Sequence, residues 1–548
     1  MDQATTTAPG RLGDPASKRS VFDEKFASGP KGPAARIAPL LFGAVVLGGL
    51  VYAVLRLLGD LGQSHETGSA PFILLGIALL IALGFECVNG FHDTANAVAT
   101  VIYTHALPPE IAVVWSGVWN FLGVLTSTGA VAFGIISLLP VELILQVSSA
   151  AGFAMVFALL IAAIIWNLGT WALGLPASSS HTLIGSIIGV GVANALNRGV
   201  DGTSGVDWDK ATEIGYALLL SPVFGFCCAA ILFLTLRFLV RKPELYAEPK
   251  GTEPPPWWIR GILVFTCTGV SFAHGSNDGQ KGMGLIMLIL IGTVPTVYAL
   301  NRTADAPQTA HFVEAAGRVD TALRRQIGSA TLESVGDPRL AVTAFVRDKK
   351  LEPETLPAVR KLVLEISDQV GRYESLRLLP DALVANVRND MYLTSEAFRL
   401  MGKKKLISFP GDDGKAVKDF IGLLNGATRF IPDWVKVAVA IALGCGTMVG
   451  WKRIVITVGE KIGKTHMSYG QGASAEMVAM GTIFAADVYG LPVSTTHVLS
   501  SGVAGTMAAN GSGLQLSTLR NLLMAWVLTL PVAILLSGSL FFLFVNIF

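Results

Sequence analysis

Two aspartates stand inside apolar sequence, and each belongs to a short polar motif. Asp93 lies in NGFHDTANA (89–97), and Asp278 lies in HGSNDGQKG (274–282). An ionised carboxylate at the depth of a bilayer costs at least about 2.5–3.5 kcal/mol, so each side chain must face a cavity, a partner or an ion. An aspartate that only caps a helix fragment is the alternative. The recurrence of the motif favours a functional site.

A glycine accompanies each aspartate. Gly90 lies three residues before Asp93, and Gly275 lies three residues before Asp278. Glycine lets a helix break and lets the backbone approach a ligand closely. We therefore expect a broken helix at each motif.

Two hydroxyl clusters follow the aspartates in the same order. The segments LPASSSHTLIGS (175–186) and LPVSTTHVLSSG (491–502) each place a proline before hydroxyl residues that open an apolar run. This pattern is typical of a helix N-terminus, where free N–H groups and the positive end of the helix dipole bind anions. Two such tips can hold one tetrahedral oxyanion. The alternative is that the hydroxyls only cap buried helices.

The carboxylates determine what must accompany the anion. Two carboxylates beside a doubly charged anion repel it strongly, even at an effective dielectric constant of about 20, so cations or protons must enter with it. Lys281 stands one turn after Asp278, where Asn96 follows Asp93, and its ammonium can replace a bound cation. The predicted substrate-binding residues are Asp93, Asn96, Ser178, Ser179, Ser180, Asp278, Lys281, Ser494, Thr495 and Thr496.

Ionisable side chains in or near these motifs are candidates for proton coupling. They are Glu86, His92, His181, His274, Glu476 and His497. Histidine titrates near physiological pH, although a neutral histidine that hydrogen-bonds a broken helix explains the four histidines equally well. Because they lack a compact ligand spacing, no metal-binding residue is predicted.

Composition and spacing indicate a membrane protein of two halves. Apolar residues make up 52% of the chain, charged residues 15%, and the mean hydropathy is +0.57; several apolar runs exceed the roughly 20 residues that span a bilayer. The aspartate-to-serine spacing is 85 in the first half and 216 in the second, and the excess matches a polar stretch. The expected parts are a disordered tail (1–36), an additional transmembrane helix (37–60), a first repeat (71–240), a linker (241–257), a second repeat (258–300 and 431–548) and a small helical, extramembrane insert (301–430).

Basic residues predict the orientation of the chain. They occur in the N-terminal tail, in the linker and in the 451–470 loop, which places these three segments in the cytoplasm and the insert outside it. The five cysteines lie in apolar segments without CxxC spacing, so free thiols are expected. The net charge of +2 gives no indication of a nucleic-acid partner.

Four motifs resemble the inorganic phosphate transporter (PiT) family, most closely its bacterial low-affinity permeases of the PitA type. They are NGFHDTANAVATVIYT, LPASSSHTLIGSIIG, FAHGSNDGQKGMG and LPVSTTHVLSSGVAGTM, and the resemblance covers nearly all of 71–548. It implies an all-α polytopic membrane protein with two inverted repeats. It also implies broken helices and re-entrant hairpins that end at the hydroxyl clusters, with phosphate held between them.

The resemblance also bears on the coupling ion. Sodium-coupled members are similar but carry Asn-Asp-x-x-Asn in both halves. Here the first half reads His92-Asp93-x-x-Asn96 and the second Asn277-Asp278-x-x-Lys281. This departure favours protons, and the PitA-type resemblance further implies carriage of divalent metal–phosphate complexes.

The resulting hypothesis is a secondary active symporter in the bacterial inner membrane. It imports inorganic phosphate, free or as a divalent metal complex, with protons by alternating access, and needs no cofactor. The alternatives are a sodium-coupled transporter, a transporter of sulfate or another oxyanion, and an anion channel. No nucleotide-binding loop or nucleophile–base pair indicates an enzyme. The expected partners are phosphate, protons and membrane lipid, and the oligomeric state is left open.

Overall fold

The structure is a computed structural model that describes residues 33–62, 69–139, 141–145, 149–249, 253–302, 306–327, 335–373 and 375–547. Nearly all of the expected N-terminal tail lies outside these ranges. The described residues form helices and connecting loops, without a β-sheet. An all-helical fold agrees with the prediction.

The first half contains α2 (Pro33–Leu61), α3 (Ser69–Tyr103), α4 (Pro109–Thr126), α5 (Ala130–Ile136), α6 (Val141–Leu145), α7 (Ala150–Ala172), α8 (Ser179–Asn197) and α9 (Trp208–Leu239). The second half begins with α10 (Trp257–Thr293) and α11 (Pro295–Tyr298), and continues through α12 (Ala306–Ile327), α13 (Pro338–Asp348), α14 (Thr355–Arg372), α15 (Asp381–Lys403) and α16 (Gly411–Thr428). It ends with α17 (Asp433–Thr447), α18 (Lys452–Ile456), α19 (Tyr469–Val488), α20 (Thr495–Asn510) and α21 (Leu516–Phe544). Short 3₁₀ turns at 202–205, 243–245 and 376–378 and a π-turn at 457–461 complete the described elements.

Several helices are long and apolar enough to cross a membrane. Within the described residues six helices meet this condition by length and composition, and two further pairs meet it together across a bend. The bends are 75° between α4 and α5 and 68° between α16 and α17. The chain is therefore a multi-pass membrane protein.

The long helices of the two halves pack in corresponding pairs. Helix α8 packs on α21 and α20 packs on α9, while α3 packs on α17 and α10 packs on α4. Small residues make these contacts close: a Cβ on Gly189 would lie 2.2 Å from the Ile534 carbonyl, and one on Gly505 would lie 2.2 Å from the Phe226 carbonyl. Such approach of backbones is how membrane helices associate without a hydrophobic driving force.

The two motif-bearing helices run antiparallel. The Arg260 guanidinium at the start of α10 donates to the Ala106 carbonyl just after the end of α3, at 2.8 Å. Helices α3 and α10 accordingly pack against each other. The two aspartates are thereby brought to the same depth from opposite directions.

The prediction of broken helices at Gly90 and Gly275 is wrong. Helices α3 and α10 continue through both residues without interruption. Each glycine instead admits a neighbouring helix: an added Cβ would lie 2.3 Å from the Leu443 carbonyl at Gly90 and 2.1 Å from the Asn120 carbonyl at Gly275. The glycines are required for helix packing, and the bends occur elsewhere.

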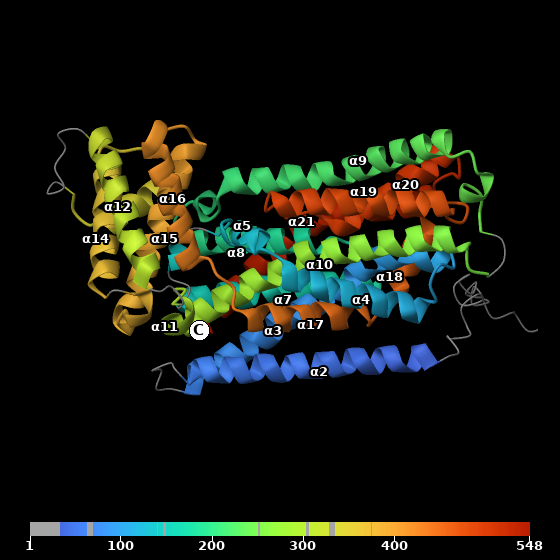
Figure 1. The fold of residues 1–548 in the computed structure, drawn as a ribbon, viewed down its shortest axis with the longest axis horizontal. Helices are drawn as coiled ribbons and strands as arrows, with labels where there is room; N and C mark the ends of the chain where they lie inside the picture. Colours follow the sequence, from blue (N-terminus) through green and yellow to red (C-terminus); the bar gives the residue numbers. More distant parts are fainter. Residues whose placement is uncertain are drawn as a thin grey trace, which may run out of the picture.

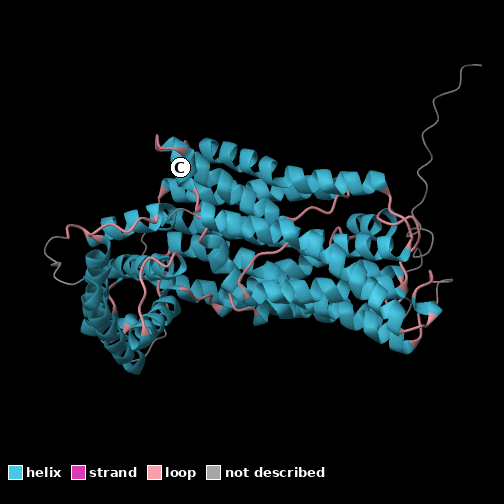
Figure 2. Cartoon of the chain, turned by 90° about the horizontal axis from the view of Figure 1, so that it is seen from above, coloured by secondary structure: helices cyan, strands magenta, loops and turns pink. Residues whose placement is uncertain are grey.

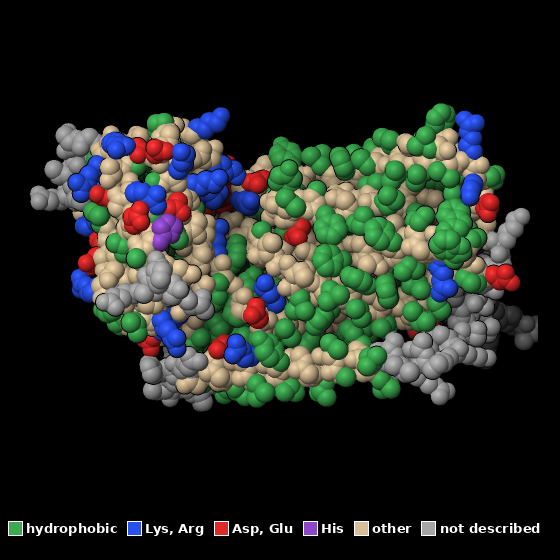
Figure 3. Space-filling view, viewed as in Figure 1, with side chains coloured by type: hydrophobic (Ala, Val, Ile, Leu, Met, Phe, Trp, Pro, Cys, Tyr) green, Lys and Arg blue, Asp and Glu red, His purple; other side chains and the backbone are tan. Residues whose placement is uncertain are grey.

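The segment expected as a helical insert does form helices. Helices α12 to α16 gather at one end of the bundle (Figures 1 and 2), and charged side chains are concentrated on their surface (Figure 3). They join the bundle through ion pairs, since the Lys349 ammonium lies 2.6 Å from Asp207 and 2.8 Å from Asp209 at the start of α9. The basic segments at 241–249 and 451–468 lie at the opposite end of the bundle (Figure 1).

Candidate functional site

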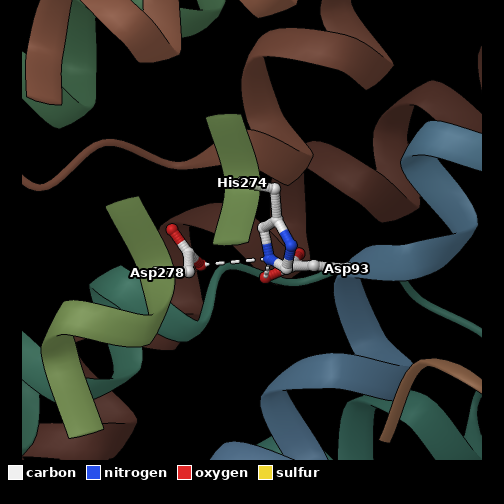
Figure 4. Close-up of side chains that lie close together, drawn as sticks. All are labelled: Asp93, His274 and Asp278. Atoms are coloured by element: carbon white, nitrogen blue, oxygen red, sulfur yellow. Dashed lines mark ion pairs between the residues drawn. The ribbon is translucent and has the colours of Figure 1, made fainter. Parts of the chain in front are cut away.

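Asp93 of α3 and Asp278 of α10 meet around one histidine ring (Figure 4). The Nε2 atom of His274 lies 3.5 Å from an oxygen of each carboxylate. His274 and Asp278 are four residues apart on one helix, so they share a face. The exposed fraction of Asp93 is 3% and that of Asp278 is 0%. The fold thus brings the two predicted aspartates into one buried cluster.

Lys281 adds a fixed positive charge to the cluster. Its ammonium lies 2.7 Å from Asp278 and donates to the Ser180 hydroxyl at 2.5 Å. The side chain is fully buried, and a buried ammonium persists only when it is paired and hydrogen-bonded. Lys281 therefore links the cluster on α10 to the first residues of α8.

The two hydroxyl clusters do form helix N-termini, as the sequence predicts. Helix α8 begins at Ser179, and the side chain of Ser178 caps it by accepting from the His181 N–H at 3.2 Å. Helix α20 begins at Thr495, and Ser494 caps it in the same way. In each tip one hydroxyl caps the helix, and the next two belong to the first turn of that helix.

The hydroxyls of Ser179 and Thr496 point at the carboxylates, while that of Ser180 donates to the Val493 carbonyl at 2.8 Å. Ser179 donates to Asp93 at 3.2 Å and lies 3.5 Å from Asp278, and Thr496 donates to the other oxygen of Asp93. The Thr495 hydroxyl is buried and has no partner among the described residues. One carboxylate oxygen of Asp278, Oδ1, also has no hydrogen-bond partner among the described residues. Both tips and both carboxylates therefore converge on one place.

Two turns of the same shape position the tips. Gly174 and Gly490, each four residues before its capping serine, adopt left-handed backbone with φ of 66° and 64°. The following residue closes each turn, with Leu175 N–H bonded to Thr170 and Leu491 N–H bonded to Ala486, both at 2.9 Å. Glycine allows φ > 0 without strain, which is why each turn needs one.

Three of the candidate proton carriers, His274, Glu86 and Glu476, are buried at or near the aspartates. His274 contacts both aspartates, and Glu86 lies against α10 beside the cluster, where a Cβ on Gly282 would be 2.4 Å from its carboxylate. Glu476 is buried on α19, where its two oxygens accept from Thr100 of α3 and Thr266 of α10. Glu476 therefore joins the two motif-bearing helices.

The other three histidines have other neighbours. His92 bonds Thr170 at 3.1 Å. His181 bonds Ser178 at 2.8 Å, and its ring centroid lies 4.6 Å from that of His497, which stacks on Trp526. His181 and His497 line a cavity of about 710 Å³ with mainly apolar walls. Of these four histidines only His274 touches the aspartates.

The sequence did not indicate which residues would hold His274 in place. Its Nδ1 atom pairs with the Asn120 amide oxygen at 2.7 Å. Asn120 is a buried amide in the apolar run of α4. A single polar residue within such a run was the sequence feature that could have identified it. The side chain of Asn96, another predicted binding residue, lies outside the described side chains.

The fold also assembles three metal-ligating side chains, although the sequence predicted none. One ligand atom from each of Asp93, His274 and Asp278 lies within 4.8 Å of the others, and all three are buried. Two carboxylates and one imidazole suit a divalent transition metal. His274 and Asp278 lie four residues apart on α10, but Asp93 comes from α3, so the sequence alone does not bring the three together.

The chain is similar to known proteins over most of its length. The model of the Phosphate transporter family matches residues 89–537. The chain is 42% identical to the low-affinity inorganic phosphate transporter PitA of Escherichia coli (strain K12), covering 86% of this chain and 96% of that protein. It is 41% identical to PitB of the same strain and 28% identical to a probable low-affinity inorganic phosphate transporter of Bacillus subtilis (strain 168). A solved structure described as the sodium-dependent phosphate transporter is 19% identical with a TM-score of 0.48, over 87% of this chain and all of that chain.

Proposed function

The chain belongs to the phosphate transporter family, and from this premise we propose that it imports inorganic phosphate together with protons as a secondary active symporter. The observation that carries the proposal is the convergence of two helix N-termini on Asp93 and Asp278, with Ser179 within 3.5 Å of both. Relatives described as transporters favour transport over catalysis.

The tips provide what an oxyanion needs. Free N–H groups at the starts of α8 and α20, the positive ends of their dipoles and the Ser179 and Thr495 hydroxyls can all donate to one ligand. Hydrogen phosphate can also donate a proton to a carboxylate such as Asp278, whose free oxygen is buried. Sulfate has no proton to donate at neutral pH, so the two carboxylates favour phosphate.

Lys281 favours protons over sodium as the coupling ion. Its ammonium already occupies the position beside Asp278 where a bound cation would compensate the carboxylate. A sodium ion that binds there without an accompanying anion would face direct repulsion from the ammonium. Protons on His274, Glu86 or Glu476 provide the remaining charge compensation. All three are buried: Glu86 and His274 lie on the motif-bearing helices, and Glu476 packs against both from α19.

We propose further that phosphate can be transported as a complex with a divalent metal. Asp93, His274 and Asp278 offer three ligand atoms to the metal, while the tips bind the phosphate oxygens. A neutral complex avoids the repulsion between the anion and the carboxylates. The metal would be cargo and leave with the phosphate.

Alternating access follows from the antiparallel halves. The corresponding pairs α8–α21 and α20–α9, and the two matched turns, support two inverted repeats that form one central site. Each turn joins two helices as in a re-entrant hairpin. The cytoplasmic segments are those at 241–257 and 451–470, the insert (301–430) faces outward, and the bacterial inner membrane is the location.

Proteoliposome uptake tests the function. Purified protein is reconstituted, and labelled phosphate is added with an inward proton gradient in sodium-free choline buffer, with the Asp93→Asn variant as the inactive control. We expect accumulation above the external concentration that collapses when the proton gradient is dissipated, and no competition by excess sulfate. Strict dependence on sodium would overturn proton coupling, and equilibration without accumulation would indicate a channel.

A further inference from the structure

A short helix from one half covers the turn of the other half, at both ends of the site. Helix α18 covers the first turn (171–177), and α5 covers the second turn (487–493). Figure 1 shows α5 on the side of the insert and α18 toward the opposite end of the bundle. The aspartates lie buried between the two covers.

The cover on the α18 side combines aromatic rings with a cation. The Trp171 ring packs on Phe91, with centroids 5.3 Å apart, and the Arg453 guanidinium lies 4.9 Å from the Trp171 centroid. Arg453 also donates to the Ala172 carbonyl at 2.7 Å, and Thr457 donates to the Gly174 carbonyl at 2.8 Å. The Trp171 indole N–H donates to the Gly450 carbonyl at 2.8 Å, so its one donor is already used and the contact with Phe91 is made by ring carbons.

The cover on the α5 side consists of hydrogen bonds to one carboxylate. Asp487 accepts from Ser276 at 2.7 Å and from Gln280 at 2.6 Å. The Gln280 amide oxygen in turn accepts from the Val131 N–H in the first turn of α5, at 2.9 Å. Asp487 is half-buried, so these hydrogen bonds lie close to the solvent-accessible edge of the turn.

The two contacts occupy equivalent places in the repeated motifs. Trp171 and Asp487 each lie seven residues before the capping serine of their tip, and Phe91 and Ser276 each lie two residues before the aspartate of their motif. One and the same contact is therefore aromatic in one half and hydrogen-bonded in the other.

We propose that Asp487–Ser276–Gln280 and Trp171–Phe91–Arg453 are the two gates of the transport path, and that their different chemistry makes them open differently. This inference rests on the proposed alternating access. The Asp487 gate can exchange its hydrogen bonds for water, so it opens readily toward the side of the insert. The Trp171 gate must expose aromatic surface to open, so it is the tighter of the two.

Side-specific thiol labelling tests the assignment without measuring transport. The five native cysteines are replaced by alanine, and Ser179→Cys provides a buried reporter between the two gates. A membrane-impermeant, charged thiol reagent is applied to proteoliposomes from one side at a time. Orientation is determined separately with Lys415→Cys, whose exposed side chain lies on the insert.

Asp487→Ala should raise the labelling rate of the reporter at least tenfold from the insert side only, with Asp487→Asn intermediate because an amide oxygen still accepts. Phe91→Ala should raise it from the opposite side only. If Phe91→Ala does not fold, Phe91→Leu replaces it in the same labelling experiment. Thr482→Ala is the matched control, because its hydroxyl donates to the Val478 carbonyl of its own helix at 2.8 Å and to nothing else in the described residues.

Two outcomes overturn the inference: unchanged labelling with Asp487→Ala, or increases from the same side for both gates. Failure of the proposed function is a separate result. In that case phosphate uptake is absent in the parent protein, while the labelling pattern still reports which contacts close the site.

Discussion

Lys281 of α10 donates to Ser180 at the tip of α8, with 2.5 Å between Nζ and Oγ. The same ammonium lies 2.7 Å from Asp278. Asp93 receives no such cation from its own helix, and it contacts hydroxyls and His274 instead. The two aspartates, equivalent in the motifs, therefore differ in what their removal leaves behind.

Asp278→Asn should cost more stability than Asp93→Asn. It leaves the Lys281 ammonium buried without its carboxylate, and breaking a buried pair costs about 3–5 kcal/mol. Thermal unfolding of the purified variants in detergent measures the difference. Adding Lys281→Met to Asp278→Asn should restore stability without restoring uptake, and equal melting temperatures for the two single variants would contradict the prediction.

Lys281→Asn should make phosphate uptake respond to sodium. The change removes the fixed ammonium and leaves Asp278 to be compensated by a mobile cation. Uptake in proteoliposomes is compared in sodium and choline buffers, with Lys281→Met as the control that removes the charge without adding an oxygen ligand. Sodium-independent uptake by the asparagine variant would show that Lys281 does not set the coupling ion.

Thr495→Ala should weaken apparent phosphate affinity about tenfold or more. Its hydroxyl is buried and has no hydrogen-bond partner in the described part of the chain, and a hydrogen bond to a charged group contributes roughly 1.5–3 kcal/mol. The concentration dependence of uptake measures the effect. Thr506→Ala, on the same helix with its hydroxyl bonded only to Val503, should leave affinity unchanged. An unaltered affinity for Thr495→Ala would mean that this hydroxyl does not contact the anion.

Gly90→Ala and Gly275→Ala should each destabilise the bundle by about 1–3 kcal/mol through overpacking. Their added Cβ atoms would lie within 2.3 Å of a neighbouring carbonyl. Gly76→Ala and Gly261→Ala are matched controls on the same two helices, because a Cβ there meets nothing within 4 Å. Thermal unfolding distinguishes the two pairs of variants. Equal stability of all four would contradict a packing role for Gly90 and Gly275 and favour a role in close approach to the ligand.

The sequence was sufficient to predict the tips of α8 and α20. Proline, hydroxyl residues and an apolar run are local signals of a helix N-terminus, and Ser179 and Thr495 begin their helices as expected. The two aspartates were equally accessible to prediction, because burial of a carboxylate is costly wherever the chain places it. The residue types alone sufficed at these positions.

The role of the glycines could not be read in the same way. Gly90 meets the Leu443 carbonyl, which is hundreds of residues away in the sequence, so only the packed structure shows that the glycine is needed for close approach. The environments of His181 and His497 were missed for a similar reason, since both rings line a cavity formed with α9 and α21. Long-range packing decided these outcomes.

The pairing of α8 with α21 determines when the first half of the protein can finish packing during translation. The Gly189 surface of α8 fits the backbone at Ile534, and Trp166 of α7 donates to Thr529 of α21 at 2.9 Å. The hairpin of α7 and α8 therefore leaves the ribosome more than three hundred residues before α21, its packing partner. Until α21 is made, α7 and α8 lack the surface that Gly189 and Trp166 contact, so packing of the first half depends on a helix of the second.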